Sequence, residues 1–115
     1  KILYVTEGPI DAMFLDNAVA MMGSDIHHSD IERFSGMANI VYVFDNEPRS
    51  KEIQRRLEQK IANNEKVVIW DKSFPYKDLN DAIIGGLTKD ILSDTIRRST
   101  YSGMKAKLMF DQWRK

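Results

Sequence analysis

The sequence predicts an α/β fold built on an open, mostly parallel sheet of about four strands, with helices on both faces. Three short runs are apolar nearly throughout and rich in β-branched residues, as parallel strands covered on both faces should be. These runs are residues 2–6, 40–44 and 66–70, and a weaker fourth candidate covers residues 19–22. Helical segments alternate with the strands over short connections, which is typical of a sheet crossed by helices.

Helix signals lie between the predicted strands. Residues 9–17 open with a proline, which suits the first turn of a helix. A serine at position 29 can cap a short helix over residues 29–34. Residues 49–63 are mostly polar and carry one apolar stripe with a spacing of four, formed by Ile53, Leu57 and Ile61.

The pattern turns helical after the last strand. One helix is expected to begin at Asp78 and to end at the glycine pair 85–86, and Thr88 can cap the next. A break at residues 102–103 precedes a last amphipathic helix that ends near Trp113. The apolar positions expected inside the last two helices are Ile91, Leu92, Ile96, Met104, Leu108 and Met109.

Length and composition fit one compact domain. The chain has 115 residues, of which 43% are hydrophobic and 30% charged, so a disordered or membrane protein is not indicated. Its apolar runs are too short to span a bilayer. It has no cysteine, which excludes disulfides and cysteine-ligated zinc. Because it begins at a lysine directly before a strand, we expect it to be a fragment of a longer polypeptide.

Charge divides the chain into an acidic body and a basic end. Residues 1–95 hold 16 acidic and 11 basic residues, whereas residues 96–115 hold one acidic and six basic residues. This asymmetry suggests a bound cation in the body and an anionic partner at the end. A solvated basic helix face is the simpler interpretation. We predict one main domain over residues 1–100 and a basic helix over residues 101–115 that packs on it or extends from it.

Acidic residues follow each of the three main strand-like runs. They are Glu7 and Asp11 after the first, Asp45 and Glu47 after the second, and Asp71, Asp78 and Asp81 after the third. Ligands bind outside the carboxyl ends of the strands in such sheets, so these acids should share one edge. Clustered carboxylates stay ionised only with a cation, and all-oxygen ligands favour magnesium, manganese or calcium. Gly8 would leave room for a phosphate beside them.

Several of these acids also have a purely structural interpretation. Asp11 would lie in a first helical turn, where any acid is favoured by the helix dipole. Asp78 and Asp81, three residues apart, resemble an N-cap pair, and Asp71 could simply end a strand. Glu7 is harder to explain in this way, because nothing local requires an acid there.

Two motifs resemble those of the Toprim domain, which is shared by bacterial-type primases, topoisomerases, some nucleases and recombination proteins. The first is the sequence EGPID at 7–11 after a strand, and the second is DNE at 45–47 after another strand. The second motif has a glutamate where the family usually has its second aspartate, and it also fits a turn before a helix. Further segments are similar to primases of T-even-type phages, namely 44–49, 69–73, 77–81 and 103–108.

The resemblance implies a role for each matching position. Glu7 would act as a general acid or base near the metal. The metal ligands would be Asp45, Glu47, Glu7 and Asp11, with Asp78 and Asp81 as supporting acids. The positions expected to bind phosphate or nucleotide are Gly8, Arg49, Lys72 and Lys77, although the lysines could equally lie on a solvated loop and Arg49 could pair with Glu47.

The resemblance also implies an activity, namely DNA primase. Such a domain would use Mg²⁺, or Mn²⁺ instead, to make short RNA primers from ribonucleoside triphosphates on single-stranded DNA during phage replication. It would work in the cytoplasm of the infected bacterium, beside a replicative helicase, and this fragment would make little primer alone. The alternatives are a Toprim-type metal-dependent nuclease and a non-catalytic module that docks a helicase.

Overall fold

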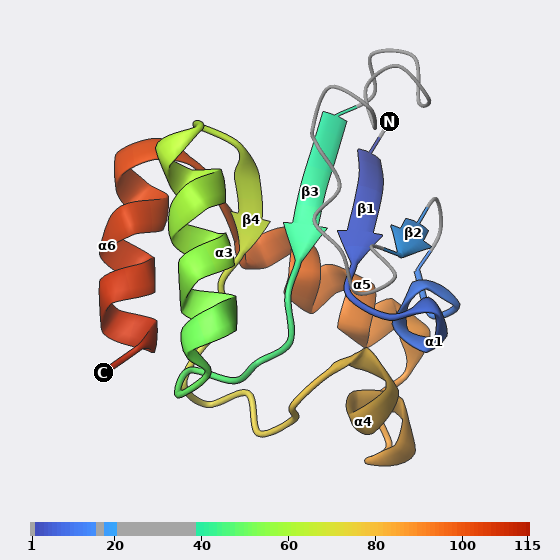
Figure 1. The fold of residues 1–115 in the computed structure, drawn as a ribbon. Helices are drawn as coiled ribbons and strands as arrows, with labels where there is room; N and C mark the ends of the chain where they lie inside the picture. Colours follow the sequence, from blue (N-terminus) through green and yellow to red (C-terminus); the bar gives the residue numbers. More distant parts are fainter. Residues whose placement is uncertain (1, 16–17, 21–38) are drawn as a thin grey trace.

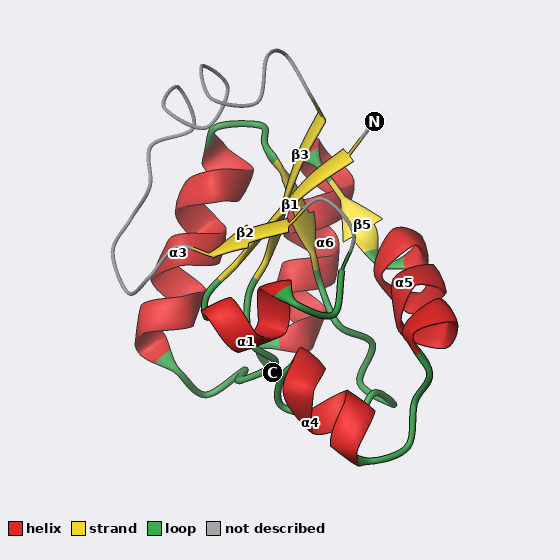
Figure 2. Cartoon of the chain, turned by 90° about the vertical axis from the view of Figure 1, so that its right-hand side faces the viewer, coloured by secondary structure: helices red, strands yellow, loops and turns green. Residues whose placement is uncertain are grey.

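A five-stranded sheet forms the centre of the molecule in the computed structural model, which describes residues 2–15, 18–20 and 39–115. The strand order is β2-β1-β3-β4-β5; β1 to β4 are labelled in Figure 1 and β5 in Figure 2. β1 pairs in parallel with both β2 and β3, β3 pairs in parallel with β4, and β5 runs antiparallel to β4. The strands are β1 (Ile2–Thr6), β2 (Ala18–Ala20), β3 (Asn39–Val43), β4 (Lys66–Val68) and β5 (Thr100–Tyr101). The predicted open, mostly parallel sheet is therefore confirmed.

The helices cover both faces of this sheet. They are α1 (Pro9–Ala12), α3 (Lys51–Ala62), α4 (Leu79–Ile84), α5 (Lys89–Arg98) and α6 (Gly103–Trp113). α3 and α5 lie on opposite sides of the strands (Figure 2). α6 packs beside α3 and also contacts β4. None of the described helices is long and apolar enough to cross a membrane.

Element ends differ from the sequence prediction in several places. α1 ends at Ala12 instead of reaching residue 17, and β4 ends at Val68 instead of residue 70. The two residues after β4 stay buried; the Ile69 N–H donates to the Ser99 carbonyl at 3.0 Å. The predicted helix at 29–34 and residues 21–22 of the predicted second strand lie outside the described residues.

β5 is an element that the sequence prediction missed. It comprises only Thr100 and Tyr101, which pair with Val68 and Val67 of β4. Two residues are too few to show the alternation that identifies a strand. Its pairing adds an antiparallel edge to the sheet.

The core confirms the predicted apolar face of α3, confirms Leu92 and Ile96 but not Ile91 in α5, and corrects the predicted face of α6. Ile53 and Leu57 of α3 are buried, as the apolar stripe predicts. In α6, however, Met104 and Leu108 are 74% and 57% exposed, and in α5 Ile91 is 54% exposed. The buried face of α6 instead consists of Ala106, Phe110 and Trp113. α6 is apolar on more than one side, and burial of the large aromatic rings decides which side faces the core.

Two helix N-termini offer a matched test of capping. The Thr88 side chain accepts a hydrogen bond from the Ile91 N–H at 3.2 Å, whereas Ser102 begins α6 without a side-chain capping bond. We expect Thr88→Ala to lower the free energy of unfolding by about 1 kcal/mol and Ser102→Ala to change it by less than about half of that. Urea unfolding monitored by circular dichroism measures both. Equal losses would contradict this assignment of the caps.

Candidate metal centre

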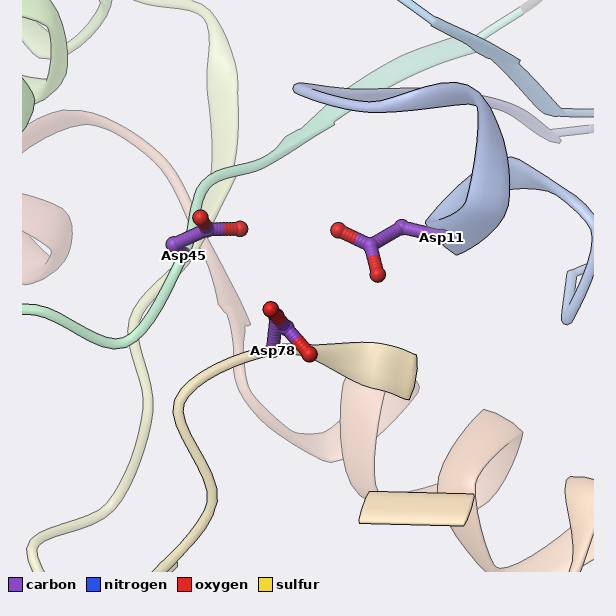
Figure 3. A group of neighbouring side chains, drawn as sticks. All are labelled: Asp11, Asp45 and Asp78. Carbon is purple, nitrogen blue, oxygen red and sulfur yellow. The ribbon is translucent and has the colours of Figure 1, made fainter. Parts of the chain in front are cut away.

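Three aspartates from separate parts of the chain meet at the carboxyl ends of the parallel strands. Asp11 comes from α1, Asp45 follows β3, and Asp78 is the N-cap of α4. One carboxylate oxygen of each lies within 4.8 Å of the other two. Their carboxyl groups point toward a common centre (Figure 3). Asp11 is the most enclosed, at 8% exposed.

Backbone N–H groups at the start of α4 hold two of these carboxylates. The Asn80 N–H donates to Asp11 Oδ1 at 3.1 Å, which ties α1 to α4 across 69 residues of sequence. The Asp81 N–H donates to Asp78 Oδ1 at 2.8 Å in the capping arrangement expected of an aspartate. The N-cap interpretation of Asp78 is therefore confirmed, and the same side chain still faces the other two aspartates.

Asp45 has the most strongly raised pKa of the group. Burial first, and then the negative charges of Glu7, Asp11 and Asp78, raise the pKa of Asp45 to about 8. Burial also raises the pKa of Asp11, against the opposing effect of the Asn80 N–H. Carboxylates brought this close favour either a retained proton or a bound cation.

Glu7 adjoins this group at the end of β1. Its Oε1 atom is buried and accepts no hydrogen bond from the described residues, although Arg56 Nη1 lies 3.8 Å away. Burial raises the pKa of Glu7 even though Arg56 lowers it. The carboxyl groups of Glu7 and Asp45 are close enough to share a hydrogen bond when one of them is protonated. The shared hydrogen bond lowers the pKa of Glu7 and raises that of Asp45, so a proton held by this pair lies on Asp45.

Glu47 and Lys77 lie at the margin of the site. Glu47 is not one of the three grouped carboxylates, but its charge contributes to the raised pKa of Glu7. Lys77 Nζ is 4.0 Å from Glu47 Oε1, and both side chains are largely open to solvent. The Lys77 N–H also donates to Asp81 Oδ2 at 3.3 Å, so Asp81 supports the loop rather than joining the group.

The remaining predicted site residues are spread around this edge. Arg49 does not pair with Glu47 among the described contacts; it donates to the Arg114 carbonyl at 2.8 Å. Lys72 is exposed on the loop after β4. A Cβ added to Gly8 would meet no atom within 4 Å, so open space surrounds that position. The helix after Gly8 has only four residues, so its dipole adds little to phosphate binding there.

Asn46 is a structural residue of the site that the sequence analysis did not single out. Its Nδ2 donates to the carbonyls of Phe74 and Tyr76 at 3.1 and 3.0 Å. Its Oδ1 accepts from Trp113 Nε1 at 2.9 Å. Asn46 thus joins β3, the 71–77 loop and the end of α6. The sequence places Asn46 between two acids, which could have drawn attention to it. Its hydrogen-bond partners, however, lie 28 to 67 residues away in the sequence.

The raised pKa values give the metal-free chain a pH dependence with a definite sign. Asp45 ionises near pH 8 when folded and near its ordinary value of 3.8 when unfolded. The folded state therefore binds more protons between these values, and stability should fall as pH rises through that window. We expect Asp45→Asn to reduce this pH-dependent loss of stability by about 1 to 2 kcal/mol. The figure is smaller than the full pKa shift of Asp45 implies, because solvent screens a partly exposed group.

Thermal melts at pH 5.5 and pH 8.5 in a chelating buffer measure this effect. The melting temperature of the wild-type chain should be lower at the higher pH, and that of Asp45→Asn should differ less between the two. A wild-type chain that gains stability toward pH 8.5 would contradict the repulsion between these carboxylates.

Comparison with known proteins places this arrangement in a family. A family model described as Toprim-like matches residues 4–83, which is most of the chain and includes the three aspartates and Glu7. The chain belongs to the Toprim-like family. It is also 33% identical over 115 residues to a protein named DNA primase from Enterobacteria phage T4. That alignment covers 98% of this chain and 33% of the relative, so the chain spans about a third of the relative's length.

These findings confirm the resemblance to Toprim domains that the two motifs predicted and the resemblance to a phage primase that the further segments predicted. Toprim domains bind divalent metals, and the chemistry of the donor set fits this property. Asp11, Asp45 and Asp78 offer only hard oxygen ligands, which suit magnesium or manganese rather than zinc. The Toprim-like chain therefore has a candidate metal centre whose ligands come from α1, β3 and α4.

Proposed function

We propose that this chain is the catalytic Toprim domain of a phage-type DNA primase. Its substrates would be ribonucleoside triphosphates and a single-stranded DNA template, and its product a short RNA primer. The observation that carries the proposal is the group formed by Asp11, Asp45 and Asp78 in a chain similar to a protein named DNA primase. A primase needs such a centre, because phosphoryl transfer depends on positioning and charge stabilisation.

The three aspartates would hold Mg²⁺ or Mn²⁺, with Glu47 at the margin. When bound, the cation would neutralise charge on the transferring phosphate and the departing pyrophosphate. Magnesium usually takes only one or two carboxylates directly and keeps several waters. This preference leaves coordination positions for the oxygens of a nucleotide. A third aspartate could then act through one of those waters.

Glu7 would serve the proton transfer. Its buried Oε1 atom accepts no hydrogen bond from the described residues, and burial raises its pKa toward the working range of a general base. We propose that the Glu7 carboxylate, whose side chain is 20% exposed, receives the proton of the attacking ribose 3′-hydroxyl. Arg56, 3.8 Å away, would hold the carboxylate in place.

Phosphate binding would fall to residues around the acids. Lys77 lies beside Glu47 and is exposed, so it can turn toward a triphosphate. Gly8 faces open space at the end of β1, which leaves room for a phosphate close to the backbone. Lys72 is exposed on the same loop as Lys77. Arg49 would have to release the Arg114 carbonyl before it could take part.

The proposed cellular setting follows from the relative's name. We propose that the chain acts in the cytoplasm of an infected bacterium during phage DNA replication, with a replicative helicase as its partner in the primosome. The basic residues of α5 and α6 are candidates for contact with DNA or with that helicase.

Ribonucleotide incorporation on single-stranded DNA by the full natural polypeptide tests the proposal. Labelled oligoribonucleotides should appear only with a divalent cation. Asp45→Asn should abolish them, and Asp90→Asn, an exposed acid in the first turn of α5, should not. Shortening of the DNA without incorporation of ribonucleotides would overturn the proposal in favour of a nuclease.

A further inference from the structure

A cavity of about 540 Å³ lies apart from the acid centre. It is enclosed by the 71–77 loop, the chain before α5, α5 itself, β5 and α6, and none of the three grouped aspartates lines it. Its volume is within the range of pockets that hold small organic ligands. The cavity therefore has the size of a ligand site that the proposed function does not use.

Aromatic rings line part of this cavity. Phe74, Tyr76 and Tyr101 all line it, and each is partly exposed. The Phe74 ring is stacked on the buried Trp70 ring with centroids 4.4 Å apart, and Tyr76 meets Phe74 edge-on at 5.4 Å. These contacts fix the rings in advance, so that a planar ligand would find an ordered apolar surface.

The position of Tyr76 requires a glycine at the end of α4. A Cβ at Gly85 would collide with the Tyr76 ring, and the Tyr76 hydroxyl donates to the Gly85 carbonyl at 3.4 Å. Asn46 holds the backbone carbonyls of Phe74 and Tyr76 from the other side. Contacts with Trp70, with Gly85 at the end of α4 and with Asn46 therefore hold the Phe74 and Tyr76 part of the cavity lining in place.

Polar and cationic groups form the rest of the rim. Arg98 reaches it from α5, is 70% exposed, and is held at its base by Asp94 at 3.0 Å. Asp71 and Ser73 line the loop side, where the Ser73 hydroxyl donates to Asp71 Oδ1 at 2.7 Å. A stacking surface beside an arginine and hydrogen-bonding groups is the combination that binds a base together with its phosphate.

We propose that this cavity binds a nucleobase, stacked against the Phe74 ring, with Arg98 on the attached phosphate. The ligand would be a nucleotide other than the one that reacts. It would come either from a single strand of nucleic acid or from a free nucleotide. This inference rests on the proposed function in one respect, since the same 71–77 loop leads from the cavity to Asp78 of the metal centre.

Fluorescence anisotropy with a labelled oligodeoxythymidylate, in a chelating buffer that removes divalent cations, tests the inference. Arg98→Gln should weaken binding about fivefold or more. Arg97→Gln is the matched control, because it removes the same charge from the same helix and the same Asp94 pair, and Arg97 does not line this cavity. The control should weaken binding less than about twofold.

Two further measurements complete the test. Phe74→Leu keeps an apolar side chain against Trp70 but removes the stacking face, and it should weaken binding as Arg98→Gln does. Competition with thymidine monophosphate separates the two sources. If the mononucleotide displaces the oligonucleotide at similar concentrations of nucleotide, the site takes free nucleotides; otherwise it takes a single strand.

Equal effects of Arg97→Gln and Arg98→Gln would overturn the inference, as would the absence of any binding by the wild-type chain. If Phe74→Leu does not fold, the arginine pair alone decides. Asp90→Asn, which removes an exposed acid of α5 that lines neither the cavity nor the metal centre, should bind the oligonucleotide normally in the same buffer. Failure at the cavity would leave the metal dependence of primer synthesis intact, whereas failure of the proposed function would appear in that activity and not in this binding.

Discussion

Asp45→Asn is expected to weaken the binding of Mn²⁺ or Mg²⁺ about 100-fold. Burial and the neighbouring carboxylates raise the pKa of Asp45, and one of its oxygens lies within 4.8 Å of one oxygen each of Asp11 and Asp78. Loss of groups that only support a metal ligand costs about 10- to 100-fold in affinity, so loss of a direct ligand should reach the upper end. Isothermal titration calorimetry with Mn²⁺ at pH 7.5 measures the change.

The ranking of variants makes this prediction specific. Asp78→Asn should also weaken binding strongly, whereas Glu47→Gln should have a smaller effect because Glu47 lies outside the three grouped carboxylates. Asp90→Asn, which removes one exposed acid from α5, serves as the control for net charge. If Glu47→Gln lowered the metal affinity as much as Asp45→Asn, and Asp78→Asn had no effect, the metal ligands would be Asp45 and Glu47 instead of the three grouped aspartates.

Asn46→Ala is expected to lower the free energy of unfolding by about 2 to 4 kcal/mol, because it leaves several partly buried partners without their hydrogen bonds. The substitution removes both donations to the carbonyls of Phe74 and Tyr76 and the acceptor for Trp113. Metal affinity should fall as well, since the released loop leads directly to Asp78. Urea unfolding and calorimetry measure the two effects.

Asn63→Ala is the matched control for this substitution. Asn63 is exposed at the end of α3, so its loss should cost less than about 1 kcal/mol and leave metal binding unchanged. Asn46→Asp is a second informative variant. It keeps an acceptor for Trp113 but adds a negative charge beside the acids and loses the donor. A stable Asn46→Ala variant with normal metal affinity would show that the loop is held by other contacts.

The strand patterns in the sequence predicted most of the fold and the general position of the site. Buried parallel strands are apolar throughout, so their ends can be found from sequence, and the acids at those ends must share one edge. This reasoning found Glu7, Asp11 and Asp45. It could not rank Asp78 above Glu47, because that order depends on a loop conformation that returns Asp78 to the centre.

Long-range side-chain contacts account for the rest. The bond between Asn46 and Trp113 spans 67 residues and leaves no local pattern. The buried face of α6 was also ambiguous, because two apolar faces fit one helical period and only tertiary packing selects Phe110 and Trp113 over Met104 and Leu108. A two-residue strand such as β5 is likewise defined by its partner and not by its own sequence.

The Asn46–Trp113 hydrogen bond connects the C-terminal helix to the residue that follows Asp45. A ligand or protein that moves α6 acts on Asn46, and through it on the loop that ends at Asp78. Coupling of this kind is reciprocal in free energy. Cation binding at the three aspartates should therefore restrain the end of α6. A ligand that binds α6 should change the affinity for the cation by the same factor as the cation changes the affinity for that ligand.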